Sequence, residues 1–127
     1  MKRKLLAVLL LSAALSGAAF AQRRAADDPC RDPQSQAEMN MCSAKRFKAA
    51  DAELSRVYNR LVTKVGGNEK LKAAEISWLK YRDDNCDYEA SLYEGGSIKP
   101  LIYSSCMERM TKARTAELRG QLKEMNQ

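Results

Sequence analysis

The sequence predicts an all-α protein: a three-helix antiparallel up-down hairpin or bundle, stapled by two disulfides. Apolar residues recur at alternating steps of three and four through two long segments and share one helix face in a third. Two glycine-rich stretches, "GGN" at 66–68 and "EGGS" at 94–97, separate these segments. No strand-like alternation occurs. Four cysteines and no histidine favour disulfides in a small exported chain.

The first 21 residues have the pattern of a secretory signal peptide. A basic start, "KRK" at 2–4, precedes an apolar run, and "AFA" at 19–21 is a small-x-small cleavage site. The run is too short to span a bilayer, and a retained anchor helix is the weaker interpretation. Cys30 follows no lipobox. We therefore expect cleavage after Ala21, export to the periplasm or beyond, and no stable membrane anchor.

The charge pattern gives no reason to expect a nucleic-acid partner. The signal takes three of the 22 basic residues and no acidic ones, which leaves 19 against 16 and a net charge of +3 instead of +6. Basic and acidic residues are interleaved along the chain, and aromatic residues are few. A solvated helix surface explains this pattern better.

The first helix is expected from Ser35 to about Val65. Residues 22–34 contain two prolines and form an irregular lead-in. Ser35 and Glu38 then make a capping box, and Gly66 can end the helix as a left-handed C-cap. The expected inward face consists of Phe47, Ala50, Leu54, Val57 and Leu61.

Two further helices follow. Asn68 can cap a second helix that runs to about Tyr93, and Pro100 suits the first turn of a third. The apolar stripe expected on the second helix comprises Leu71, Ala74, Trp78, Tyr81, Asn85, Tyr88 and Leu92. The face expected on the third comprises Ile102, Cys106, Met110, Ala113, Leu118 and Leu122. The helical domain would span residues 35–122, with a frayed tail at 123–127.

Helix register predicts the disulfide pairing. Short connections make neighbouring helices antiparallel, so facing positions should total about 134 in residue number across the first turn and about 193 across the second. Cys86 and Cys106 total 192 and should face each other. Cys42 and Cys86 are offset by about three residues, or roughly 4–5 Å along each axis, which is too far for an undistorted bridge. We pair Cys86–Cys106 and, by elimination, Cys30–Cys42. Zinc is disfavoured because no cysteines have CxxC spacing.

The same register brings Asp51 and Arg82 together between the first two helices. A ligand-binding guanidinium is one interpretation of Arg82, and a structural partner of Asp51 is the one we favour. Trp78 and Tyr81 lie on the stripe beside it. We expect Trp78 to be a core residue and not a platform for a cofactor.

The chain has few means of catalysis. Histidine, the commonest general base, is absent, and the cysteines are committed to bridges. Asp83 and Asp84 are adjacent on a helix and point about 100° apart, so they cannot flank one bond. No nucleotide, phosphate or calcium motif occurs. We expect a binding protein with no cofactor, no metal and no enzymatic activity.

Five ordered segments resemble the LprI-like lysozyme-inhibitor domain family, formerly a domain of unknown function. They are "SQAEMNMC", "AADAELSRVYNRL", "LKAAEISWLKYRDDNC", "EGGSIKPLIYSSC" and "TKARTAEL", between about residues 30 and 118. The family-typical positions are Met39, Asn40, Cys42, Asp51, Leu54, Tyr58, Trp78, Tyr81, Arg82, Cys86, Gly95, Gly96, Cys106, Arg114 and Leu118. Ser55 and Glu75 stand where asparagine and glutamine are usual. The resemblance implies an exported, disulfide-bonded helical domain that inhibits lysozyme, with a structural role for Arg114.

The loop "YEGGSIKP" at 93–100 is the candidate partner-binding element. Its minimal role is a tight joint, in which glycines supply positive φ angles. A Cys86–Cys106 bridge would stiffen the stem and lower the cost of ordering the loop on binding. The candidate contact residues are Tyr93, Glu94, Ser97, Ile98 and Lys99.

The partner expected is a protein, with lysozyme as the first candidate. A net charge of +3 provides no steering toward a cationic lysozyme, but a local acidic patch would offset this. The candidate patch consists of Asp83, Asp84 and Asp87. Stoichiometric occlusion of a lysozyme-type muramidase is the function we favour, and the alternative is an envelope interaction module without lysozyme inhibition. The sequence predicts no oligomeric state.

Overall fold

The computed structural model describes residues 28–127, so the expected signal peptide lies outside the described residues. This described part forms three helices, namely α2 (Gln36–Lys64), α3 (Glu69–Ser91) and α4 (Lys99–Glu124). No strand occurs between residues 28 and 127, and the all-α prediction is confirmed. Residues 28–33, which precede α2, contain no helix.

The start of α2 is built from the predicted capping residues. The Ser35 hydroxyl accepts a hydrogen bond from the Glu38 N–H at 3.1 Å. The Glu38 carboxylate accepts one from the Gln34 N–H at 2.6 Å, one residue earlier than in the standard capping box. Two donors at the helix start are thereby satisfied.

The turn between α2 and α3 uses two left-handed glycines and a side-chain cap. Gly66 and Gly67 have φ angles of +67° and +76°, and the Gly67 N–H donates to the Val62 carbonyl at 3.0 Å. The Asn68 side chain accepts hydrogen bonds from two N–H groups in the first turn of α3. The turn therefore has the caps that the sequence predicts.

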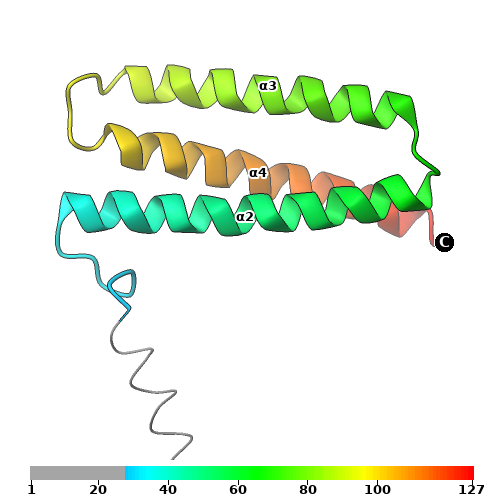
Figure 1. The fold of residues 1–127 in the computed structure, drawn as a ribbon, viewed down its shortest axis with the longest axis horizontal. Coiled ribbons are helices and arrows are strands. Elements are labelled where there is room, and N and C mark those ends of the chain that lie inside the picture. The colour runs from blue at the N-terminus through cyan, green and yellow to red at the C-terminus, as the bar shows by residue number, and fades with distance from the viewer. Residues whose placement is uncertain (1–27) are drawn as a thin grey trace, which may run out of the picture. The chain divides into compact units, whose positions relative to one another are not determined.

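The three helices lie side by side, and the chain reverses direction at each turn (Figure 1). Contacts pair Glu75 with Arg114 and Cys86 with Cys106, so α3 and α4 run antiparallel. We expected α2 to face α3 along its length. Instead, α2 packs most extensively on α4, which also packs on α3.

Both predicted disulfides are present. The Cys86–Cys106 bridge joins α3 to α4 with a Cα–Cα distance of 5.5 Å, as the register predicts. Cys30 and Cys42 are also disulfide-bonded. Because the chain has four cysteines and none is free, these two can only pair with each other.

The core consists of two clusters of buried side chains between the helices. One contains α2 residues and Leu118 of α4, each at most 3% exposed. The other surrounds the Cys86–Cys106 bridge and includes Met107, with Phe47 packed against it. The predicted inward face of α2 is confirmed: Phe47 is partly buried, and the buried members are Ala50, Leu54, Val57 and Leu61.

The apolar stripe predicted on α3 is wrong over its C-terminal half. Tyr81, Tyr88 and Leu92 are 60%, 63% and 67% exposed. Ala74 is exposed as well. The buried residues of α3 are instead Glu75, Arg82, Cys86 and Ala90.

The reason lies in the rotation of α3 about its axis. Leu71, Trp78 and Asn85 are half-buried, whereas Ala74, Tyr81 and Tyr88, the alternate members of the stripe, are exposed. The buried face is turned toward Glu75 and Arg82, which pair with Arg114 of α4 and Asp51 of α2.

The inward face of α4 is more polar than predicted. Ala113 is exposed, whereas Ser104, Thr111 and Thr115 are buried. The Thr115 hydroxyl donates to the Thr111 carbonyl at 2.9 Å, and the Thr111 hydroxyl accepts from Arg82 at 3.2 Å. Within the described residues no buried side-chain nitrogen or oxygen lacks a partner, so these hydroxyls cost little to bury.

Candidate functional surface

The candidate site is an exposed strip on the C-terminal half of α3 together with the loop that follows. We call it the tyrosine–acid face, defined by Tyr81, Asp84, Asp87, Tyr88, Leu92 and loop residues 93–98. Its α3 residues lie at helical steps of three and four and are all exposed. Tyrosine and leucine side chains in solvent beside carboxylates are typical of a protein-binding surface.

The three aspartates of the predicted acidic patch differ in their surroundings. Asp83 accepts a hydrogen bond from Arg82 Nε at 2.9 Å and is therefore engaged within the bundle. Asp84 lies 2.6 Å from Lys80 Nζ, and its hydrogen bond and charge raise the pKa of Lys80. Asp87 is exposed, and no ion pair involves it within residues 28–127. Of the three, Asp87 is thus the one with no ion pair in the described part of the chain, and Asp84 is exposed but paired with Lys80.

Tyr103 of α4 lies near two of these aspartates, Asp83 and Asp87. Burial raises the pKa of its phenol, and the charges of Asp83 and Asp87 raise it further. Asp87 and Tyr103 also line a small hollow between α3 and α4, together with Ala90. The negative charge of α3 therefore reaches the surface of α4.

The loop after α3 is held in one conformation by its own backbone. Gly95 has a φ angle of +76°, which only glycine adopts without strain. The Gly96 N–H donates to the Tyr93 carbonyl at 3.0 Å, and the Lys99 N–H donates to the Gly96 carbonyl at 3.1 Å. The Lys99 ammonium lies 2.5 Å from a Glu94 carboxylate oxygen.

A side chain of α2 also holds this loop. Asn40 Nδ2 donates to the Ser97 carbonyl at 3.0 Å, and the Gln36 amide donates to Asn40 Oδ1 at 2.9 Å. We assigned Asn40 no role from the sequence. The topology could have predicted this contact, because in an up-down bundle the start of the first helix and the second turn lie at the same end (Figure 1).

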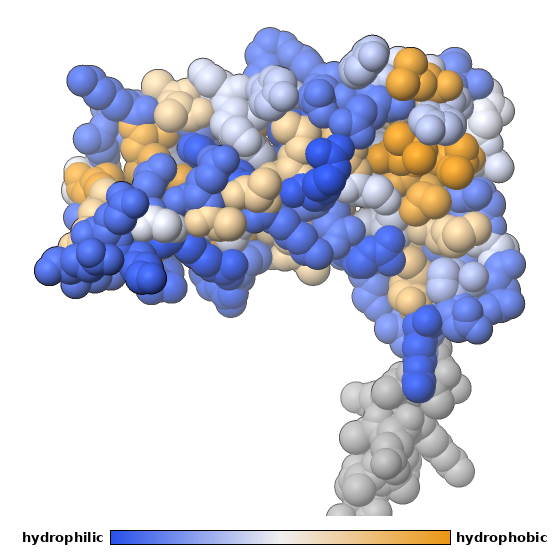
Figure 2. Space-filling model, turned by 180° about the vertical axis from the view of Figure 1, so that it is seen from behind, coloured by the Kyte–Doolittle hydropathy of each residue, from blue (hydrophilic) through white to orange (hydrophobic). Residues whose placement is uncertain are grey.

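The loop residues differ in how far a partner can reach them. Tyr93 is 43% exposed, and Glu94 and Ser97 are also exposed. Ile98 and Lys99 are half-buried, since they begin α4. Figure 2 shows apolar surface gathered at this end of the bundle, where exposed Leu92 flanks the loop.

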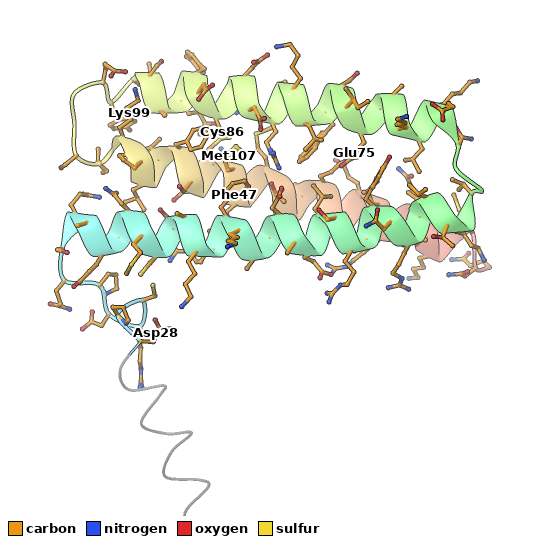
Figure 3. All side chains as sticks on the ribbon, viewed as in Figure 1. Asp28, Phe47, Glu75, Cys86, Lys99 and Met107 are labelled. Carbon is orange, nitrogen blue, oxygen red and sulfur yellow. A yellow bond between two sulfur atoms is a disulfide. The ribbon has the colours of Figure 1, made fainter. Side chains whose placement is uncertain are left out.

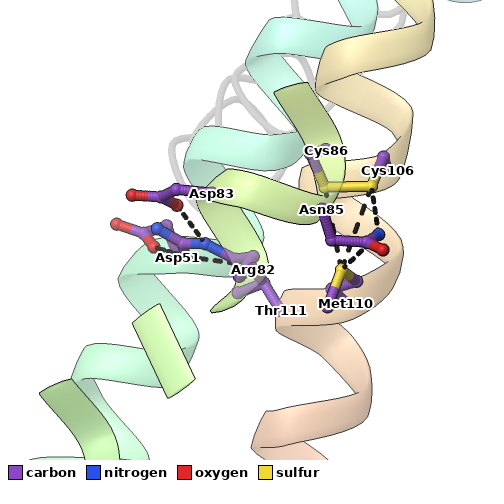
Figure 4. A network of polar contacts seen from close by, with 8 residues as sticks. All are labelled: Asp51, Arg82, Asp83, Asn85, Cys86, Cys106, Met110 and Thr111. Atoms are coloured by element: carbon purple, nitrogen blue, oxygen red, sulfur yellow. Dashed lines mark hydrogen bonds and ion pairs between the residues drawn. A yellow bond between two sulfur atoms is a disulfide. The ribbon is translucent and has the colours of Figure 1, made fainter. Parts of the chain in front are cut away.

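Arg82 is a structural centre and not a free guanidinium. Its side chain is only 8% exposed, and Nη1 lies 2.8 Å from Asp51 Oδ1, the ion pair that the register predicts. The same nitrogen donates to the Thr111 hydroxyl, and Nε donates to Asp83 (Figure 4). One residue of α3 is thereby tied to both α2 and α4.

Trp78 and Arg114 are engaged in the same interior. The Trp78 ring packs against the core, with the Arg82 and Arg114 guanidinium carbons 5.3 and 5.8 Å from its centroid. Arg114 Nε and Nη2 each lie 2.9 Å from Glu75 Oε2. Figure 3 shows Glu75 on the side of α3 that faces α4. Tyr81, which we grouped with these structural residues, points into solvent instead.

Within residues 28–127, no group of three or more histidine, cysteine or acidic side chains could hold a metal ion. In the same part of the chain, no helix is long and apolar enough to cross a membrane. The charged groups inside the bundle are paired. The fold and the surface together define a small, disulfide-stapled helical protein, with three helices in residues 28–127, whose candidate site is an exposed face.

Residues 26–118 match the family described as lysozyme inhibitor LprI. The chain therefore belongs to the LprI lysozyme inhibitor family, as the resemblance of its five segments predicts. An uncharacterized protein of Rhizobium meliloti (strain 1021) is 33% identical over an alignment of 124 residues, gaps included, and the match covers 86% of this chain and 89% of that protein. No solved structure matches.

Proposed function

We propose that this protein is exported and inhibits a lysozyme-type muramidase by binding it one-to-one through the tyrosine–acid face. One observation carries the proposal. A chain of the LprI family leaves Tyr81, Tyr88 and Leu92 in solvent on one strip of α3, although its interior charges are all paired. These side chains supply contact area that buries well against a protein.

Charge supports a basic partner. The face carries Asp84, Asp87 and Glu94, and acidic groups beside apolar contacts speed the approach of a cationic protein. A second copy of the same chain would place these carboxylates opposite like charges. The face therefore fits a cationic lysozyme better than it fits itself.

The ordered loop contributes to the same binding. Backbone turns, the Asn40 hydrogen bond and the Cys86–Cys106 bridge hold residues 93–98 before a partner arrives. A loop that is already ordered loses less conformational entropy on binding. Tyr93, Glu94 and Ser97 then occlude the muramidase cleft.

Export and the absence of catalysis belong to the same proposal. The signal-like residues 1–21 support export, and two disulfides support an oxidising compartment such as the periplasm. The chain has no histidine, and its cysteines are bonded. Inhibition by occlusion requires neither a histidine nor a free thiol.

The test is a turbidity assay of cell-wall lysis with the purified chain from Gln22. We expect inhibition of at least one animal lysozyme to saturate at one inhibitor per enzyme. Lack of inhibition at tenfold excess over each lysozyme tried contradicts the proposal and favours an envelope module with another partner. Complete inhibition far below one equivalent contradicts occlusion and indicates an enzyme.

A further inference from the structure

A hollow lies between α3 and α4 at the loop end of the bundle. We call it the α3–α4 hollow, and it is lined by Asp87, Ala90, Lys99, Pro100 and Tyr103. Its volume of about 280 Å³ is that of about nine water molecules. The hollow can therefore take one long side chain, whereas a whole helix does not fit.

The inner surface of the hollow is largely apolar. Ala90 is only 2% exposed and forms the floor. Pro100, in the first turn of α4, has no N–H to offer, and the half-buried Tyr103 ring packs against the core cluster around the Cys86–Cys106 bridge. The aliphatic stem of a long charged side chain is buried favourably on such a surface, provided that its charged end finds a partner.

Asp87 supplies that partner at the edge of the hollow. Its side chain is exposed, and no ion pair within residues 28–127 involves it. Adjacent residues of a helix point about 100° apart. Asp87 is therefore turned away from the Tyr88 ring and toward the hollow that it lines. It belongs both to the edge of the tyrosine–acid face and to the hollow.

The two cations near the hollow are already matched by carboxylates. The Lys99 ammonium lies 2.5 Å from a Glu94 carboxylate oxygen. Arg82, whose charge reaches Tyr103, pairs with two aspartates. The charge of Asp87 is thus in excess, and an added cation is attracted to this end of the bundle.

We propose that the α3–α4 hollow receives one arginine side chain of the protein partner, with its guanidinium at Asp87. This inference rests on the proposed function, because it takes the cationic partner as given and names the group that the partner inserts. A planar guanidinium forms two parallel hydrogen bonds with a carboxylate and stacks on an aromatic ring such as that of Tyr103. An apolar side chain would instead leave Asp87 desolvated without a partner.

Dissociation kinetics with an inhibited lysozyme test the inference, using the chain from Gln22. Asp87→Asn keeps the shape of the side chain and removes its charge, so we expect the dissociation rate constant to rise by about tenfold. The matched control, Glu69→Gln, removes one carboxylate from the exposed start of α3. This control should change the dissociation rate constant by less than about twofold.

A second measurement needs no lysozyme. The probe N-acetyl-arginine amide is added to the isotope-labelled chain at constant ionic strength, and the amide signals are followed by nuclear magnetic resonance. We expect shifts at residues 87–90 and 99–103 that are lost in the Asp87→Asn chain and kept in the Glu69→Gln chain. N-acetyl-citrulline amide, which has the same shape without the charge, should not produce them.

Several results would overturn the inference. An equal rise in the dissociation rate constant for Asp84→Asn, which lies outside the hollow, would assign the effect to the charge of the whole face. Equal shifts with the citrulline or the lysine amide would contradict a guanidinium site. Dimerisation that Asp87→Asn abolishes would assign the arginine to a second copy of the chain.

Failure of this inference is distinguishable from failure of the proposed function. If inhibition is intact and Asp87→Asn dissociates like the unchanged chain, the hollow receives no arginine although the proposed function holds. If no lysozyme is inhibited, the proposed function fails, and the titration with the arginine amide decides the hollow by itself.

Discussion

At the scale of single residues, the centre of the bundle is held by a buried arginine. Arg82 is tied to Asp51, Asp83 and Thr111 and lies 5.4 and 5.3 Å from the ring centroids of Phe47 and Trp78. Its guanidinium is thus paired and stacked, which is the condition for burying a charge.

Replacing this arginine should cost far more than replacing its partner. Arg82→Ala removes the packing on two rings and three hydrogen bonds, so we expect the free energy of unfolding to fall by about 2–4 kcal/mol. The Asp51 side chain is 44% exposed, and solvent screens its charge. Asp51→Asn should therefore cost only about 1 kcal/mol or less. Urea denaturation followed by circular dichroism measures both, and equal losses would contradict the central role of Arg82.

Acid should weaken the ion pair between Arg46 of α2 and Glu108 of α4. Hydrogen bonds from Lys112 and then Arg46 hold the pKa of Glu108 below its ordinary value of 4.5, against the opposing effect of burial. A carboxylate with a lowered folded pKa stabilises the fold above the unfolded pKa, and that stabilisation is lost as the pH falls through the folded value. Glu108→Gln should flatten the decline of stability below about pH 4.5. If the melting temperature of the Glu108→Gln variant falls at acid pH as steeply as that of the unchanged chain, other carboxylates control the acid sensitivity.

At the scale of elements, the sequence predicts the parts that depend on neighbouring residues. The caps at Ser35, Gly66 and Asn68 follow from local chemistry, and they define the helix ends within a residue or two. Short turns define the register of α3 against α4. The register in turn predicts the Cys86–Cys106 bridge, which contributes on the order of 3 kcal/mol by closing a loop of this size.

The orientation of α3 could not be predicted in the same way. Its apolar stripe is a real period, but its inward face is chosen by partners on other helices, Asp51 for Arg82 and Arg114 for Glu75. Those two ion pairs favour the observed orientation of α3, in which the Tyr81 ring stays in solvent. The candidate loop was found from its glycines, whereas the exposed strip beside it required the structure.

The hydrogen bond from Asn40 to the loop gives a prediction at this scale. Asn40→Ala removes the only side-chain tie from α2 to Ser97 among the described contacts, so amide hydrogen exchange at residues 95–98 should speed up. Inhibition should weaken by about threefold to tenfold, while the free energy of unfolding changes by about 1 kcal/mol or less. Gln36→Ala, which only orients Asn40, should have a smaller effect. Unchanged exchange in the Asn40 variant would show that this hydrogen bond does not order the loop.

At the scale of the whole molecule, charge is divided between two outward faces. Carboxylates are exposed on α3 and at the loop, and cations are exposed along α2. The net charge therefore describes neither face. A cationic partner finds the carboxylates of α3 and the loop complementary to it.

Charge reversal on α3 should slow association with a cationic lysozyme. For Asp84→Lys with Asp87→Lys, we expect the association rate constant to fall by about tenfold at low salt and the difference to shrink at high salt. Stopped-flow mixing over a range of ionic strength measures this. An equal change in the dissociation rate alone would mean that these carboxylates act in the bound state and not in steering.

Amide hydrogen exchange of the chain with and without an equimolar inhibited lysozyme most directly tests where the partner binds. We predict slowed exchange in the C-terminal half of α3 and in loop residues 93–98, with the outward side of α2 unchanged. Protection confined to α2, or none outside the helix cores, would contradict binding through the tyrosine–acid face.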